Sequence, residues 1–230
     1  MEEIKKALAE ADPFASWWPF IVAGIVFVIG TQHLQCNYLS HFLLTQLLRP
    51  QLARSAHGGR IVHVSAHGYT AAKIADRDDP LNLRQPAQSG RDAFAHSKLA
   101  IVLGSRALAG KLTAEGCSTT VNCCSPGLVR GTGHLRHSPI MKALFAKVLT
   151  FPWMWLFMKS PAQGAHTIVR LVTDPALAGC TGVFFNDCER VEVSELARDD
   201  ELADRLYRAS LSAVGLTEDA ARGTVRPKKE

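Results

Sequence analysis

Short β-branched runs alternate along this chain with longer stretches whose apolar residues recur at helical spacing. Residues 60–65 read RIVHVS, residues 118–124 read STTVNCC and residues 182–185 read GVFF. Runs of this kind, bounded by glycine or proline, are typical of short buried strands. Residues 91–112, between the first two runs, have the apolar periodicity of a helix. Strands that alternate with helices predict an α/β fold with a parallel sheet.

Three further helices are predicted around these strands. The leucines of residues 37–48 recur at helical spacing, and Pro50 should end that helix. Ser160 and Pro161 have the residue types of an N-cap and a first helical position, so they predict a helix start. Residues 193–213 form a last amphipathic helix.

Two segments are unusually apolar. Residues 15–29 carry no charge and have Trp17 and Trp18 near their start, which suit a membrane interface. Extended to residue 33, the run approaches the roughly 20 residues of a membrane span, and no cleavage site follows it. Residues 1–33 are expected to be an apolar helix that anchors the chain in a membrane, or else an element of the core. Residues 140–158 are expected to be a lid that also contacts a membrane, or a core helix.

Charge and cysteine content argue against two classes of function. The formal charge is +5. The basic residues of the chain are scattered, apart from those in the tail at 217–230. This distribution favours a solvated surface over a nucleic-acid interface. The six cysteines, with His41, His96 and His137, show no metal-ligand spacing. We therefore expect no metal and free thiols in a reducing compartment. The remaining residues, 34–216, suffice for one domain.

The most informative motif lies on the predicted helix at 91–112. It reads Phe94-Ala95-His96-Ser97-Lys98, and its first and fifth residues lie on one helical face. A tyrosine at the first position would have its pKa lowered by the lysine ammonium and could donate a proton. Phe94 has no proton to donate, so Lys98 lacks the group that such a pair would activate.

The order of these motifs resembles the short-chain dehydrogenase/reductase family, most closely its retinol-dehydrogenase-like members. The resemblance runs from about Leu34 to Leu216. It rests on six strings in the family's order: NYLSHFLL at 37–44, RIVHVS at 60–65, HSKLA at 96–100, Pro126-Gly127, LRHS at 135–138 and GVFFNDC at 182–188.

The resemblance implies hydride transfer between NADP or NAD and a lipophilic alcohol or carbonyl, retinoid- or steroid-like. The family's asparagine, which supports a relay water, corresponds to Asn37. Its lysine, which assists the tyrosine and holds the nicotinamide ribose, corresponds to Lys98. Its Pro-Gly pair, which lines the nicotinamide, corresponds to Pro126 and Gly127.

Two catalytic positions of the family carry residues without a hydroxyl. The tyrosine corresponds to Phe94. The serine that does the chemistry is the second of a pair, which corresponds to Ala66, while Ser65 matches the first. General acid–base catalysis typically accelerates such a reaction roughly 10²–10⁴-fold. With Phe94 and Ala66 at these positions, no side chain is evident that would provide it.

The family's pyrophosphate site is also altered. Its Thr-Gly-x-x-x-Gly-x-Gly turn has its nearest counterpart at residues 23–30, where Val28 replaces the middle glycine. Upstream of Asn37 there is no room for the first strands, which take on the order of 80 residues. The resemblance thus predicts a partial Rossmann-like sheet that lacks the first strands and the Gly-rich turn, as in a truncated isoform, and it puts cofactor binding in doubt.

Several individual roles stay open at this point. Lys98 is either a ribose-binding residue or an ordinary helix-surface lysine. Asn37 either supports a relay water or caps the helix at 37–48. Tyr69 lies in a long polar loop at 66–90, of a length that is usually functional, and it is the one candidate to replace the missing acid.

Three hypotheses for the function follow. The first is a membrane-associated, retinol-dehydrogenase-like homologue with impaired or no activity, on the endoplasmic reticulum with its domain in the cytosol, or alternatively cytoplasmic. The second is a non-enzymatic interaction protein that forms a homodimer through the helices at 37–48 and 91–112. The third is an active enzyme on a lipid carbonyl that uses an unrecognised acid.

Overall fold

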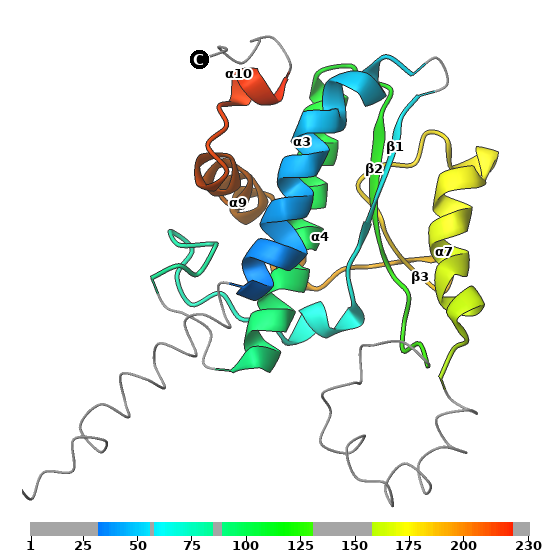
Figure 1. Cartoon of the computed structure of the whole chain (residues 1–230), viewed down its shortest axis with the longest axis horizontal. Coiled ribbons are helices and arrows are strands. Elements are labelled where there is room, and N and C mark those ends of the chain that lie inside the picture. Colours follow the sequence, from blue (N-terminus) through cyan, green and yellow to red (C-terminus); the bar gives the residue numbers. More distant parts are fainter. Residues whose placement is uncertain (1–31, 56–57, 85–88, 131–157, 223–230) are drawn as a thin grey trace, which may run out of the picture.

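A four-stranded sheet organises the part of the chain that the computed structural model describes, residues 32–55, 58–84, 89–130 and 158–222 (Figure 1). The strands lie in the spatial order β1-β2-β3-β4. Their bounds are β1 Arg60–Val64, β2 Thr120–Ser125, β3 Phe184–Asn186 and β4 Glu189–Val191. The first three strands are parallel and β4 is antiparallel to β3. The predicted α/β class is confirmed, whereas β4 was not predicted.

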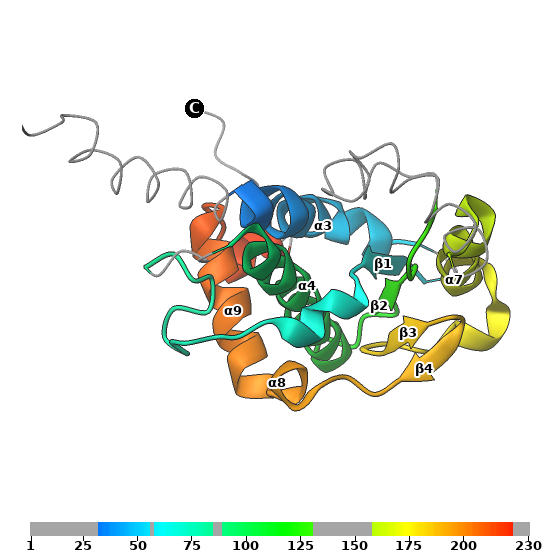
Figure 2. The ribbon, with the colours of Figure 1, turned by 90° about the horizontal axis from the view of Figure 1, so that it is seen from below.

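Helices cover both faces of the sheet. On one face lie α3 (Ser40–Ala53), α4 (Gly90–Ala114) and α9 (Asp200–Ala213), and on the other lies α7 (Pro161–Thr173). Figure 2 shows α3, α4 and α9 together, with α7 apart from them beside the sheet.

The sheet separates two apolar layers because successive strand residues point to opposite faces. Cys123 of β2 and Phe184 of β3 belong to the large core around α4. Their neighbours Cys124 and Phe185 belong to a smaller core with Leu171 of α7. The continuous apolar sequence of these strands is therefore that of a sheet buried on both sides.

The central helix is α4, and the prediction at 91–112 is confirmed. Its first turn is stabilised by Ser89, whose side chain accepts a hydrogen bond from Asp92 N–H. The helix contacts β2, α9 and the 3₁₀ helix η2 (His67–Ala71), so most of its circumference is buried.

The helix predicted at 37–48 is longer than expected. The chain is helical from Gln32, through the π-helix η1 (Gln35–Leu39), to the end of α3 at Ala53. Pro50 does not end it, so that prediction was wrong. A proline removes one backbone hydrogen bond, but here the last turns are anchored by an ion pair between the buried Arg49 and the more exposed Glu115.

The C-terminal helices agree with the prediction except that the last one is divided in two. The start at Ser160 is confirmed, with a capping box to Gln163, and η4 (Pro175–Leu177) follows α7. The predicted helix at 193–213 is divided into α8 (Glu195–Arg198) and α9. The break occurs because Asp199 accepts a hydrogen bond from Leu202 N–H and so caps a new helix. A short α10 (Glu218–Ala221) was not predicted.

Several predictions fall outside the described residues. These are the apolar helix at 1–33, except for its last two residues, the segment at 140–158, except for Met158, and residues 223–230 of the tail. Within the described ranges, no helix is both long and apolar enough to span a membrane.

Gly104 and Gly110 of α4 test how tightly this core is packed. A Cβ at Gly104 would lie 2.7 Å from Tyr38 Oη. Tyr38 is 3% exposed and its hydroxyl lies 2.9 Å from Ser210 Oγ, so the ring cannot move aside at low cost. We expect Gly104→Ala to lower the free energy of unfolding by about 1–3 kcal/mol, measured by urea denaturation.

Gly110→Ala is the matched control on the same helix. A Cβ there meets nothing within 4 Å, so the gain in helix propensity should stabilise the protein by about 0.5–1 kcal/mol. Equal effects of the two substitutions would contradict the packing of Tyr38 against α4.

Candidate active site

The predicted site residues gather at the carboxyl ends of β1 and β2. In open α/β sheets this edge is where ligands bind. The two strand ends are joined by the hydrogen bond from Ser65 N–H to Cys124 O, 2.8 Å long. The helix α4 packs against β2 and η2, and Lys98 is hydrogen-bonded to Val64 and Ser65, which places the motif at 94–98 beside the same edge.

Lys98 lies between the end of β1 and the ring of Phe94. Its Nζ donates to Val64 O at 3.1 Å and is 5.7 Å from the centroid of the Phe94 ring. Burial lowers the pKa of Lys98, with a smaller opposing effect of Cys123. The shared helical face of positions 94 and 98 is therefore observed, and Lys98 is a half-buried side chain bonded to backbone, not a freely solvated one.

Asn37 joins this group through Ser97. Its Nδ2 donates to Ser97 Oγ at 3.0 Å and lies 3.4 Å from His33 Nδ1. Ser97 Oγ in turn donates to Phe94 O at 2.8 Å. The alternative that Asn37 is an N-cap was wrong, because the helix begins upstream and Asn37 lies inside η1. Short π-helical segments are frequently found at functional sites.

Ala66 follows directly on the strand end that contacts Lys98. Ser65 is buried and its Oγ donates to Lys98 O at 2.8 Å. A Cβ on Gly68 would lie 3.7 Å from the Phe94 ring. The segment from 66 to 68 is therefore beside Phe94, and position 66 presents a methyl group where the family has a hydroxyl.

The tyrosines of this chain are all buried. The chain has three tyrosines, and all of them lie in the described core with exposures of 3%, 3% and 1%: Tyr38, Tyr69 and Tyr207. Tyr69, the candidate replacement, has its ring 5.4 Å from that of Phe184 and accepts a hydrogen bond from Ser194 N–H. Burial also raises the pKa of Tyr38, which makes its proton harder to lose.

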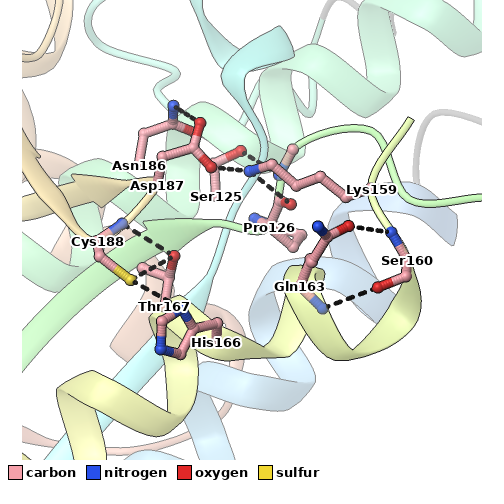
Figure 3. Close-up of polar contacts among 11 residues, drawn as sticks. Ser125, Pro126, Lys159, Ser160, Gln163, His166, Thr167, Asn186, Asp187 and Cys188 are labelled. Atoms are coloured by element: carbon pink, nitrogen blue, oxygen red, sulfur yellow. Dashed lines mark hydrogen bonds and ion pairs between the residues drawn. The ribbon is translucent and has the colours of Figure 1, made fainter. Parts of the chain in front are cut away.

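Pro126 and Gly127 follow β2 and contact Lys159, a residue that the sequence did not indicate. Figure 3 shows Lys159 beside Pro126 and Asp187. Lys159 Nζ donates to Pro126 O at 3.5 Å and forms an ion pair with Asp187. Gly127 has φ +73°, and a Cβ there would lie 2.9 Å from Lys159 Nζ. The one sequence signal for Lys159 was its position directly before the helix cap at Ser160.

The described ranges contain no group of three or more His, Cys, Asp or Glu side chains that could hold a metal ion. The polar groups at this edge are instead the ammonium groups of Lys98 and Lys159, the carboxamide of Asn37 with the His33 imidazole beside it, and hydroxyls that donate to backbone carbonyls. Such groups can bind and orient a polar ligand, but none of them is a proton donor in the position of the family tyrosine.

Individual relatives, but no family model, indicate the family of this chain. No family model matches the chain. It is 39% identical over 182 residues to retinol dehydrogenase 14 of Homo sapiens, a match that covers 78% of this chain and 51% of that protein. It is 35% identical over 192 residues to human retinol dehydrogenase 13 (84% and 56%) and 37% identical over 185 residues to the chloroplastic short-chain dehydrogenase TIC 32 B of Brassica napus (77% and 55%).

The chain belongs to the short-chain dehydrogenase/reductase family. Its homologues include retinol-dehydrogenase-like members, as the motifs predicted, and it spans about half the length of the curated relatives it matches. A solved structure of an uncharacterized protein from Mycobacterium paratuberculosis has the same fold, with a TM-score of 0.55 and 24% identity over 78% of this chain and 57% of that one.

The lowered pKa of Lys98 predicts a stabilising substitution. The unfolded chain binds the Lys98 proton more tightly than the folded protein does, so the charged side chain opposes folding at neutral pH, and stability rises as the pH rises toward the unfolded value of about 10.4. Lys98→Met keeps the apolar stem. We expect it to raise the free energy of unfolding at pH 7, and the gain should shrink toward pH 10–11, measured by urea denaturation.

Lys111→Met is the control for Lys98→Met. Burial works against the charge of Lys111, but hydrogen bonds with Glu218 and Asp204 outweigh it and raise the pKa. The same substitution should therefore destabilise the protein at pH 7. A loss of stability in Lys98→Met at pH 7 would show that its ammonium stabilises the fold.

Proposed function

We propose that this chain is a retinol-dehydrogenase-like homologue that has lost the proton-transfer step of the family reaction. The observation that carries the proposal is the Phe94 ring beside Lys98, at the position of the family's tyrosine. The family reaction, an NADP- or NAD-dependent oxidoreduction of a lipophilic alcohol or carbonyl, is then not completed by this chain as it stands.

The chemistry of carbonyl reduction supports this proposal. Hydride addition leaves an alkoxide, and a positioned acid must lie within hydrogen-bond reach of that oxygen to protonate it. Phe94 and Ala66 offer no proton. The nearby hydroxyls of Ser65 and Ser97 donate to backbone carbonyls, and Lys98 holds an ammonium with no phenol to activate.

The nicotinamide side of a cofactor site is better supported than the pyrophosphate side. The Lys98 ammonium has three N–H donors, and one of them goes to Val64 O, so the others could meet ribose hydroxyls. Pro126 and Gly127 would line the nicotinamide, which supplies or accepts the hydride when it is bound. The described residues contain no Gly-rich turn to hold a pyrophosphate. Relatives named retinol dehydrogenase favour a retinoid-like substrate class.

Turnover assays test the proposal directly. We expect no NADPH- or NADH-dependent reduction of retinal by this chain above the level of Lys98→Ala, because acid catalysis worth roughly 10²–10⁴-fold is missing. NADPH fluorescence, recorded in parallel, separates a failure of chemistry from a failure of cofactor binding. A rate above that of Lys98→Ala would overturn the proposal.

The double substitution Ala66→Ser with Phe94→Tyr refines this test. It restores both hydroxyls but no pyrophosphate turn, so we expect the double variant also to be inactive. Turnover by the double variant would mean that the cofactor does bind and that the two side chains are the whole defect.

A second candidate function, a non-enzymatic interaction protein, is favoured by the outer face of α3. Three leucines there are 57%, 57% and 46% exposed: Leu44, Leu47 and Leu48. The predicted dimer face also included the helix at 91–112, but α4 is buried along most of its length. We therefore propose that any such contact uses α3 alone.

Light scattering after size exclusion tests the α3 contact. If it joins two copies, replacing Leu44, Leu47 and Leu48 with Gln should halve the measured mass without unfolding the chain. Replacing Val169 and Val172 of α7, which are about equally exposed at 53% and 50%, should leave the mass unchanged. A monomeric unsubstituted chain would exclude the homodimer.

A further inference from the structure

A cysteine lies in the tight turn between β3 and β4, in contact with α7. Asp187 and Cys188 are the two central residues of this hairpin, with φ +51° and +66°. Side chains of α7 hold the backbone of Cys188 on both sides. Cys188 N–H donates to Thr167 Oγ1 at 3.1 Å, and Arg170 Nη1 donates to Cys188 O at 2.8 Å.

The sulfur of Cys188 has a base and a hydroxyl beside it (Figure 3). Its Sγ lies 3.7 Å from His166 Nδ1 and 3.6 Å from Thr167 Oγ1. Thr167 Oγ1 accepts from Cys188 N–H, so its own hydrogen can point to the sulfur. His166 is exposed, and with its proton on Nε2 its Nδ1 can accept the thiol proton. A nucleophile with a base in reach, held by a third group, is the arrangement that activates thiols.

We propose that Cys188 and His166 form a covalent modification site for soft carbon electrophiles of the α,β-unsaturated carbonyl class. The sulfur lone pair forms a bond to the β-carbon, and the π electrons of the C=C bond move toward the carbonyl as an enolate. The thiol proton passes to His166 Nδ1 and then to the α-carbon. The addition is complete without an oxidant, a reductant or a leaving group.

The other thiols lack this arrangement. Cys123 and Cys124 are buried, and burial, with a smaller effect of the neighbouring Cys188, raises the pKa of Cys124 to about 11. Cys36 is exposed, but in the described part of the chain no hydrogen bond joins its sulfur to an imidazole. Cys36 is therefore an internal reference for an accessible thiol without a base.

The surroundings favour an electrophile with an alkyl chain. Val169 is 53% exposed and lies one helical turn from His166, so it offers apolar surface beside the imidazole. Asp187, in the same turn, is ion-paired with Lys159, which donates to Pro126 O. A group attached to Cys188 would thus lie beside the ion pair that holds the Pro126–Gly127 loop.

The test is a time course of alkylation of the whole folded chain at pH 7, with peptide mass spectrometry that reads the six cysteines separately. Iodoacetamide and trans-2-hexenal serve as probes. We expect Cys188 to react at least about tenfold faster than Cys36 with either probe, since general base catalysis contributes that much or more. In denaturant the two rates should become similar.

His166→Gln separates catalysis from simple accessibility. This exposed substitution should lower the rate at Cys188 by about tenfold and leave the rate at Cys36 unchanged, with an unaltered circular dichroism spectrum. Cys188→Ser should abolish the fast-reacting site. A Cys188 rate no greater than that of Cys36, or an unchanged Cys188 rate in His166→Gln, would overturn the proposal.

Discussion

The burial of α4 on nearly every side is the constraint on which the rest of this structure depends. Leu99, Leu103 and Leu108 are at most 2% exposed, and the helix is in contact with β2, α9 and η2 along its length. A helix enclosed in this way cannot rotate or slide without opening the core, because protein interiors are close-packed. The orientation of its first turns is fixed as a result, and Phe94 and Lys98 remain at the carboxyl end of β1.

That constraint holds Lys98 in a place where the surroundings oppose its charge. Lys98 is partly desolvated, and its contacts are a backbone carbonyl and an aromatic ring. Its charge therefore opposes folding at neutral pH, and residues of this kind are common at functional sites, where activity and stability compete. The absence of a hydroxyl at positions 66 and 94 leaves the lysine as the remaining charged member of the family's catalytic group.

Local signals predicted the long elements well and the short ones poorly. The helices α4 and α7 were predicted from periodicity and from an N-cap, both of which depend on neighbouring residues only. The strand β4 was missed because Glu189–Val191 is short, exposed and without alternation. The Asp187-Cys188 turn also lacks the glycine or asparagine that normally marks a two-residue hairpin.

The sequence by itself determined which chemical groups this site can contain. Phe94 stands one helical turn before Lys98, and Ala66 follows Ser65, and both relations are local. Only the tertiary structure decided that Asn37 reaches the motif through Ser97 across 60 residues, that all three tyrosines are buried, and that His166 meets Cys188. Contacts of this kind depend on strand register and on how helices pack over the sheet, and these arise from the whole core, which no local pattern encodes.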